Sequence, residues 1–312
     1  MVLAITGPTG VGKSDVALAA ARLLDGEIVN YDSIQMVRGF DIGSAKPNRA
    51  MLKEVPHHLI DVVDPIDPLD AAVFVNLARG AVRDILGRGK VPILVGGTFF
   101  YLRGLLDGIA TMPGQNRDFR RRIARIRSHQ RGRWWLTRWL RRVDPLSADR
   151  IAVGDTHRVE RALEVWFSSG RPISSYVPDT PGLAMETATV RVALRRPRED
   201  LQAMIDSRAA AMFEAGLVEE TETLLSQWPD SARPFDAIGY REAVGVVRRR
   251  LSRVEAIDET RRRTRAYAKR QMTWLRGERD MQWIDVADDP EALASRVQRI
   301  VEARAERNRP VQ

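Results

Sequence analysis

The stretch Gly7-Pro8-Thr9-Gly10-Val11-Gly12-Lys13-Ser14 decides the fold that this sequence predicts. It matches the phosphate-loop pattern G-x-x-x-x-G-K-[ST], and it stands in the context that the motif requires. Residues 2–5 form an apolar run that predicts a buried strand, and residues 15–24 are rich in Ala and Leu and predict a helix. A strand, a glycine loop and a helix in this order aim backbone N–H groups at an anion. We therefore predict a site for a ligand that carries a di- or triphosphate.

The last two residues of the loop add specific chemistry. Lys13 supplies a mobile positive charge, and the Ser14 hydroxyl suits Mg²⁺ bound to the same phosphates. A glycine-rich turn that binds no ligand is the alternative. The strand before the motif and the helix after it argue against that alternative.

The composition bounds the class of protein. A chain of 312 residues buries a large core and commonly divides into two domains. No stretch approaches the ~18 to 20 apolar residues of a membrane helix, and the early phosphate loop leaves no room for a signal peptide. The absence of cysteine excludes disulfides and cysteine-bound zinc, which fits a cytoplasmic protein. The net charge of +9 and the pI near 10.4 favour a polyanionic partner, although excess Arg also serves solubility.

Two further predicted strands end in polar residues that suit the same site. Asp32 follows the strand predicted over residues 27–31, and Thr98 follows the strand over residues 91–95 and two glycines. Ligands of open α/β sheets bind at the carboxyl ends of strands, so both side chains are expected to face the phosphate loop. Asp32 can hold Mg²⁺ through water or accept a proton from a nucleophile, and an N-cap is its alternative role. Thr98 can offer its hydroxyl to a phosphate or metal, and a mere tight turn is the alternative there.

A pair of histidines stands in the run from residue 56 to residue 65. The apolar centre of this run predicts a strand, and the pair His57-His58 offers two potential metal ligands. Adjacent residues on a strand point to opposite faces, and no third ligand is evident, so we do not predict a metal there.

The composition changes after Pro113-Gly114. Arginine is dense over residues 117–142, where Ile and Trp recur at helical spacing. We predict a small all-helical insertion over residues 115–176, with Trp135 and Trp139 in its own core, and stacking of those rings on bases is the less favoured alternative. A solvated face normally mixes both charges, so the arginines predict contacts with backbone phosphates.

The chain beyond the insertion returns to alternating elements. Strands are predicted over residues 189–194 and 282–286, and helices over residues 198–214, which carry Arg208, and over residues 261–276. The fold class is therefore α/β, a P-loop NTPase-like core with a parallel sheet flanked by helices. Residues 1–114 and 177–312 make up this core.

Taken together, these stretches resemble the bacterial tRNA dimethylallyltransferases (tRNA isopentenyltransferases), which prenylate the adenosine 3′ of the anticodon. Besides the phosphate loop, the matching stretches are Asp32-Ser33-Ile34-Gln35, Asp41-Ile42-Gly43-Ser44-Ala45-Lys46-Pro47, Pro56-His57-His58-Leu59, Gly96-Gly97-Thr98, Arg161-Ala162-Leu163-Glu164-Val165, Gly239-Tyr240-Arg241-Glu242 and Ala268-Lys269-Arg270-Gln271-Met272-Thr273-Trp274-Leu275-Arg276. They follow the family's order over nearly the whole chain. The phosphate loop is shared with many nucleotide enzymes, whereas the Asp-Ser-x-Gln and Ala-Lys-Arg-Gln-x-Thr-Trp runs are far more specific.

The resemblance implies a role for each matching position. Asp32, Thr98, Lys13 and Arg208 would be catalytic, with Asp32 as general base; the phosphate loop would bind the diphosphate; and Ser14 would meet Mg²⁺. The residues implied in tRNA binding are Asp32, Ser33, Ile34, Gln35, Thr98, Arg120, His157, Arg158, Val159, Glu160, Arg161, Asp236, Ala237, Ile238, Gly239, Tyr240 and Arg241. Asn30-Tyr31 departs from the small residues common before Asp32, Ser44 replaces the usual Thr, and His157 stands where Gln is familiar.

The implied reaction transfers the dimethylallyl group of dimethylallyl diphosphate to N6 of adenosine 37 in the tRNA anticodon stem-loop, by a protein acting as a monomer. Three alternatives remain at this point. A nucleotide kinase would use the same Lys13 and Ser14 but would consume ATP and would not need the basic insertion. An isopentenyltransferase acting on free AMP also has no need of the insertion. An RNA-binding module with a relict nucleotide site would not need Asp32, Thr98 and Arg208 together.

Overall fold

The chain folds into two units. The computed structural model describes residues 1–67, 69–129, 131–152, 154–286 and 289–307. The larger unit comprises Met1–Asp107 and Gly182–Gln312, and the smaller unit, Gly108–Pro181, is inserted between these two parts of the sequence. The predicted insertion, residues 115–176, lies within the range of the smaller unit.

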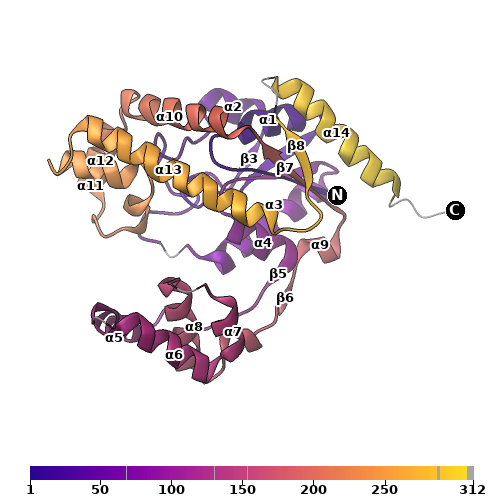
Figure 1. Ribbon diagram of the computed structural model, residues 1–312. Helices are drawn as coiled ribbons and strands as arrows, with labels where there is room; N and C mark the ends of the chain where they lie inside the picture. The colour runs from indigo at the N-terminus through magenta and orange to yellow at the C-terminus, as the bar shows by residue number, and fades with distance from the viewer. Residues whose placement is uncertain (68, 130, 153, 287–288, 308–312) are drawn as a thin grey trace. The chain divides into compact units, whose positions relative to one another are not determined.

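A six-stranded parallel sheet forms the centre of the larger unit (Figure 1), in the order β3-β2-β4-β1-β7-β8. Its strands are β1 (Val2–Thr6), β2 (Gly26–Asn30), β3 (His57–His58), β4 (Val91–Val95), β7 (Thr189–Arg195) and β8 (Gln282–Asp285). Every residue of β1 is buried, as expected of a strand covered on both faces. The register pairs Ile5 of β1 with Val95 of β4 and Val192 of β7, so the carboxyl ends of these strands align. The sheet is therefore all parallel, as the sequence predicts.

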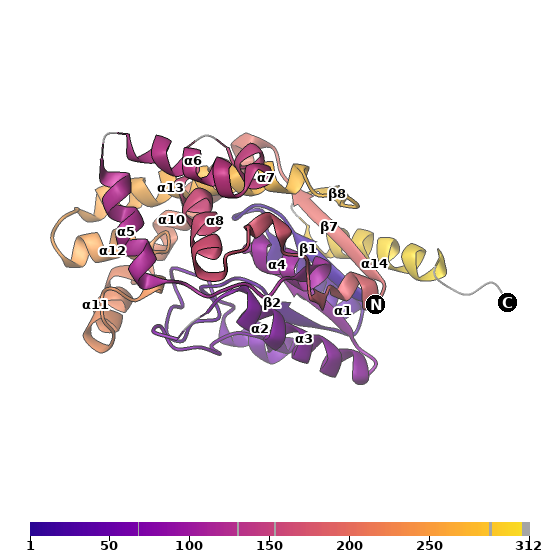
Figure 2. The ribbon, with the colours of Figure 1, turned by 90° about the horizontal axis from the view of Figure 1, so that it is seen from below.

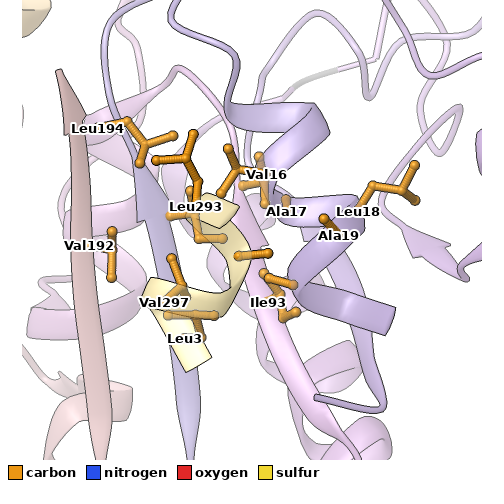
Figure 3. Packing of buried hydrophobic residues seen from close by; sticks show 14 of the residues in the cluster. Leu3, Val16, Ala17, Leu18, Ala19, Ile93, Val192, Leu194, Leu293 and Val297 are labelled. Atoms are coloured by element: carbon orange, nitrogen blue, oxygen red, sulfur yellow. The ribbon is translucent and has the colours of Figure 1, made fainter. Parts of the chain in front are cut away.

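Helices cover the sheet and extend beyond it. In the larger unit they are α1 (Lys13–Leu23), α2 (Arg49–Glu54), α3 (Ala71–Gly87), α4 (Phe99–Asp107), α9 (Leu183–Glu186), α10 (Arg198–Glu214), α11 (Leu217–Gln227), the 3₁₀ turn η2 (Arg233–Asp236), α12 (Tyr240–Val247), α13 (Arg253–Arg276) and α14 (Pro290–Arg307). α1 and α14 pack together against one face, where Val16 and Val297 meet Leu3 and Leu194 of the strands (Figure 3). This packing fixes the start of α1, and with it the phosphate loop.

The smaller unit contains a group of helices (Figure 2) and a pair of short strands (Figure 1). It contains α5 (Arg117–Ser128), α6 (Gly132–Val143), α7 (Pro145–Arg150), α8 (Thr156–Ser169), the 3₁₀ turn η1 (Ile173–Ser175) and the antiparallel pair β5 (Gly108–Ile109) and β6 (Thr180–Pro181). Phe119, Ile123, Leu136, Leu140 and Leu163 form its core. The prediction that Trp135 belongs to this core is wrong, because its side chain is 54% exposed, whereas Trp139 packs at the edge of the core.

The chain after β3 differs from the prediction of a strand in the apolar centre of residues 56–65. Only His57 and His58 pair with β2, and Val63 forms an isolated bridge with Val37. Leu59 and Asp61 have φ angles of 63° and 55°, so the backbone turns away from extended geometry there. Within the described residues, no helix is both long enough and apolar enough to cross a membrane.

Candidate functional site

The phosphate loop begins the site at the carboxyl end of β1. Gly12 is the N-cap of α1 with a φ of 96°, a left-handed conformation that favours glycine. The Lys13 Nζ donates to the carbonyls of Gly7 and Pro8, both at 3.0 Å. Burial and, second, the neighbouring Arg208 together lower the pKa of Lys13 to about 8, while Asp32 opposes the shift. A bound anion would stabilise the charged form of this buried ammonium, so the low pKa of Lys13 is consistent with an anion-binding site.

Asp32 directly follows β2, and Asn30 fixes its backbone. The buried Asn30 side chain accepts from Asp32 N at 2.9 Å through Oδ1, and its Nδ2 donates to the Asp32 carbonyl at 3.2 Å and the Leu59 carbonyl at 3.0 Å. The Asp32 carboxylate accepts from Ile34 N at 3.0 Å through Oδ1. A Cβ added to Gly97 would stand 3.0 Å from Asp32 Oδ2. One carboxylate oxygen is therefore tied to the backbone, and the other lies beside the glycine pair that follows β4.

The end of β4 packs directly against the end of β2. A Cβ on Gly96 would stand 2.5 Å from the carbonyl carbon of Tyr31, so only glycine allows this approach. Thr98 Oγ1 accepts from Ser33 N at 3.1 Å, which joins the two strand ends a second time. Asp32 and Thr98 thus lie at one edge of the sheet, as the sequence predicts for residues after parallel strands.

α13 connects this edge to the phosphate loop. Gln271 accepts from Thr9 N at 2.8 Å and donates to the Gly97 carbonyl at 2.9 Å. Tyr267, one helical turn earlier, donates to the same carbonyl at 2.9 Å. No sequence pattern predicted a role for these two residues or for Asn30. Gln271 lies in the specific run from Ala268 to Arg276, and that run was the only signal for it.

Two cavities meet at Asp32 and Arg208. The smaller, of about 120 Å³, is lined by Lys13, Ser14, Gly96 and Gly97 among others, and the larger, of about 560 Å³, by Thr98, Asp236 and three arginines of α13. Five residues line both cavities and so form a shared wall: Thr9, Asp32, Ser44, Arg208 and Tyr267. Burial lowers the pKa of Arg208, while Asp32 and Asp15 oppose the shift. The smaller cavity therefore has the groups that suit a phosphate, and the larger cavity is lined by the same Asp32 carboxylate and Arg208 guanidinium.

The remaining predicted residues of the larger unit fall into two groups. Ser33, Ile34, Asp236, Ala237 and Ile238 line the larger cavity, and Gln35 lines the smaller one. Tyr240 is fully buried, and its hydroxyl donates to Glu220 at 2.6 Å and accepts from Gly43 N at 3.1 Å. Gly239 is buried beside it, while Arg241 is exposed. The Tyr240 side chain thus holds the loop around Gly43 in place, and its predicted contact with RNA is not available in this conformation.

The smaller unit carries the other predicted residues around a buried carboxylate. Glu164 is 1% exposed and accepts from Arg120, Arg161 and the backbone of Asn116 at 2.7 to 2.8 Å. Burial alone would raise the pKa of Glu164, but these hydrogen bonds outweigh it and hold the pKa below its usual value. Val159 is buried, Glu160 pairs with Arg127 at 2.9 Å, and His157 and Arg158 are exposed. Arg120 and Arg161 therefore also hold this unit together.

The described residues contain no cluster of three or more His, Asp or Glu side chains that would hold a metal alone. Ser14 is exposed at the start of α1 and lines the smaller cavity with Lys13 and Asp32. Mg²⁺ in phosphate sites commonly has few protein ligands and is completed by phosphate oxygens and water. This donor set fits a metal that arrives with a phosphate ligand.

Comparison with known proteins agrees with this geometry. The family model described as IPP transferase matches residues 35–278. The chain is 40% identical over 301 residues to a tRNA dimethylallyltransferase of Solibacter usitatus, covering 96% of this chain and 97% of that protein. It is 42% identical over 297 residues to one of Anaeromyxobacter sp., covering 95% and 98%.

Solved structures give the same result. The tRNA isopentenylpyrophosphate transferase of Bacillus halodurans has a TM-score of 0.70 and 32% identity, with 98% of each chain covered. A eukaryotic dimethylallyltransferase acting on tRNA has a TM-score of 0.77 and 26% identity, with 100% of this chain and 80% of that chain covered.

Proposed function

Because the chain belongs to the IPP transferase family, we propose that it transfers a dimethylallyl group from dimethylallyl diphosphate to tRNA. The acceptor is N6 of the adenosine 3′ of the anticodon, position 37, and the products are N6-(dimethylallyl)adenosine and diphosphate. The protein acts as a monomer in this proposal, since one chain supplies both cavities.

The observation that carries the proposal is the shared wall of the two cavities. Asp32 and Arg208 line both the cavity that contains Lys13 and Ser14 and the larger cavity that contains Thr98 and the α13 arginines. A transferase needs a donor and an acceptor that meet at one set of catalytic groups. This arrangement supports a diphosphate donor in the smaller cavity and a flipped-out adenine in the larger one.

The chemistry follows from the charges at that wall. The bond between C1 of the dimethylallyl group and the diphosphate oxygen breaks, and a bond between C1 and adenine N6 forms. Lys13, Arg208 and the N–H groups of the loop stabilise the negative charge that develops on the departing diphosphate. Asp32 accepts the proton that N6 loses. Thr98, bonded to Ser33, keeps the strand end that carries Asp32 in place for the acceptor.

Mg²⁺ is proposed as the cofactor, held by the Ser14 hydroxyl and the donor's phosphates. The metal, when bound, supplies further neutralisation of the diphosphate charge. Ser14 suits this role because it is exposed beside Lys13 in the smaller cavity.

The tRNA is proposed to contact both units. In the larger unit, the predicted residues that line the acceptor cavity are Asp32, Ser33, Ile34, Thr98 and the stretch from Asp236 to Ile238. Gln35 lines the smaller cavity, and Arg241 is exposed. In the smaller unit, Arg158 keeps 71% of its side-chain surface exposed, and Arg120 keeps 46% despite its ion pair with Glu164. These groups, with His157 beside them, support contacts with the anticodon stem-loop, chiefly with its phosphates.

One incubation tests the proposal. The protein is mixed with Mg²⁺ and dimethylallyl diphosphate labelled in the five-carbon group, and tRNA lacking this modification, AMP or neither is added. We expect label in tRNA alone, and nuclease digestion should return it as N6-(dimethylallyl)adenosine. Label in AMP instead, or consumption of ATP with no label transferred from the five-carbon donor, would reject the proposal.

A further inference from the structure

α6 presents a continuous outer face of aromatic and basic side chains. The six residues of this α6 face are Arg131, Trp134, Trp135, Arg138, Arg141 and Arg142. They recur three or four positions apart, so they share one side of the helix. Trp134 and Trp135 are 53% and 54% exposed, although tryptophan is usually well buried.

The core of the smaller unit does not need these two rings. Leu136 and Leu140, on the opposite side of α6, are buried in the core, and Trp139 packs beside them. Trp134 and Trp135 contact each other edge to face, with their ring centroids 4.8 Å apart. The Arg138 guanidinium lies over the Trp134 ring, 5.2 Å from its centroid. The rings are therefore held in place by their neighbours while much of their surface faces outward.

The charge of this face is largely uncompensated. α6 itself contains no Asp or Glu. Among the described residues, the only carboxylate paired with the face is Asp149, 3.4 Å from Arg141. On α5 and α8, by contrast, Arg120, Arg127 and Arg161 each pair with a glutamate. Arg131, Arg138 and Arg142 pair with no described carboxylate and can therefore meet an external anion.

We infer that the α6 face is an RNA-binding surface. Trp134 and Trp135 stack on unpaired bases, and Arg131, Arg138 and Arg142 bind the adjacent phosphates. Aromatic rings interleaved with arginines are the combination that binds single-stranded RNA, because every base has a stacking face and every nucleotide carries a charge. The inference rests on the proposed function, which makes a tRNA the RNA that reaches this surface.

RNA fits the face better than a lipid surface does. An interfacial membrane helix buries a broad aliphatic stripe in the acyl region, whereas the aliphatic residues of α6 already lie in the core of the unit. A second copy of this chain, with its net charge of +9, would bring like charges together at this face.

The test compares two double variants, Trp134→Ala/Trp135→Ala and Trp134→Phe/Trp135→Phe. Binding of fluorescent tRNA is measured by anisotropy without donor, and KM and kcat are measured with donor. The alanine variant should bind tRNA at least about fivefold more weakly and raise its KM, with kcat and the KM for dimethylallyl diphosphate unchanged. The phenylalanine variant should keep most of the affinity because a ring remains. Wild-type affinity in both variants would overturn the inference.

A second variant covers the case in which the alanine variant unfolds, as a lower melting temperature would show. Arg131→Gln/Arg138→Gln/Arg142→Gln keeps both rings and should reduce the slope of log affinity against log salt by about 2 to 3. An unchanged slope would overturn the inference. The inference would also be overturned if the variants bound tRNA normally but no longer bound anionic vesicles. The same holds if they bound tRNA normally but no longer self-associated in light scattering. If the wild type transfers no label to tRNA, the proposed function fails; if it is active and these variants bind tRNA normally, only this inference fails.

Discussion

The side chain at position 30 shows how one residue sets the position of another. Asn30 bonds to the N–H and the carbonyl of Asp32 and also to Leu59 in the turn after β3. The Asn30 bonds hold the backbone that carries the Asp32 carboxylate, and that matters for a group expected to accept a proton.

Replacing Asp32 by Asn should abolish transfer and leave tRNA binding nearly intact. The amide oxygen can still accept from Ile34 N as the carboxylate does, but the residue can no longer act as a base. Loss of a general base costs roughly 10² to 10⁴-fold in rate. Single-turnover rates and filter binding of tRNA measure the two properties. A rate within a few-fold of wild type would rule out this role for Asp32.

Replacing Asn30 by Ala should lower kcat by roughly 10- to 100-fold, because the backbone of Asp32 loses both of its bonds to this side chain. Asn116→Ala is the matched control, since Asn116 caps α5 in the smaller unit through Phe119 N. Both variants should be less stable in thermal melts, the control by about 1 kcal/mol. Only Asn30→Ala should lose kcat at saturating substrates, and equal kcat values for the two would refute the positioning role.

Lys13 should make donor binding depend on pH. Its pKa of about 8 lies below the usual 10.5, so in the free protein it is charged below pH 8 and becomes neutral as the pH rises through 8. A bound diphosphate favours the charged form, and the affinity should therefore fall above pH 8, by about tenfold between pH 7 and pH 9. Calorimetry with a non-reactive diphosphate analogue measures this change. Lys13→Gln should bind more weakly with no such fall, and a persisting fall would assign the titration to another group.

At the scale of elements, the site depends on three strand ends and one long helix. β1, β2 and β4 bring the phosphate loop, Asp32 and Thr98 to one edge of the sheet. α13 starts with a capping box, in which the side chains of Ser252 and Glu255 each bond to the other's backbone N–H, and the helix extends earlier than the predicted residue 261. Its residues Tyr267 and Gln271 then bond to Gly97 and, through Gln271, to the phosphate loop.

Gly96→Ala should separate the ends of β2 and β4. The new methyl would stand 2.5 Å from the Tyr31 carbonyl carbon and 2.7 Å from Asp32 N, both of them backbone atoms in the strand end. We expect a lower melting temperature and a fall in kcat of roughly 100-fold. Gly80→Ala is the control, because nothing lies within 4 Å of a Cβ there in the interior of α3. It should raise stability by about 0.5 to 1 kcal/mol. Wild-type kcat in Gly96→Ala would show that this close approach is not needed.

At the scale of the whole molecule, the net charge of +9 is unevenly used. Some arginines of the smaller unit pair with buried or half-buried carboxylates, as Arg120 does with Glu164. Others, such as Arg125, are exposed and form no ion pair with a described carboxylate. Positive charge therefore serves both stability and the attraction of a polyanion, and a count of arginines does not separate the two.

Arg125→Glu should raise the KM for tRNA and reduce its dependence on salt, because exposed arginines that meet phosphates release counterions. The KM for dimethylallyl diphosphate should stay unchanged, since the donor cavity is lined by the larger unit. Arg120→Glu should instead destabilise the smaller unit, by about 3 to 5 kcal/mol, because it sets a second carboxylate against the buried Glu164. Steady-state kinetics at two salt concentrations and thermal melts compare them. An unchanged tRNA KM and salt slope in Arg125→Glu would remove it from the RNA contact.

The sequence by itself determined the parallel α/β core, the glycine loop between β1 and α1, and the place of Asp32 and Thr98 at strand ends. These follow from local patterns, namely apolar runs, glycine spacing and the rule that parallel strands end at one edge. Tertiary structure decided what depends on contacts between distant residues. Gln271 bonds to Thr9, which lies 262 positions away in the sequence. Tyr240 is buried and bonds to Glu220, although its stretch of sequence predicted a contact with tRNA. It also turned Trp134 and Trp135 outward, since periodicity places residues on a helix face and only packing decides which face is covered.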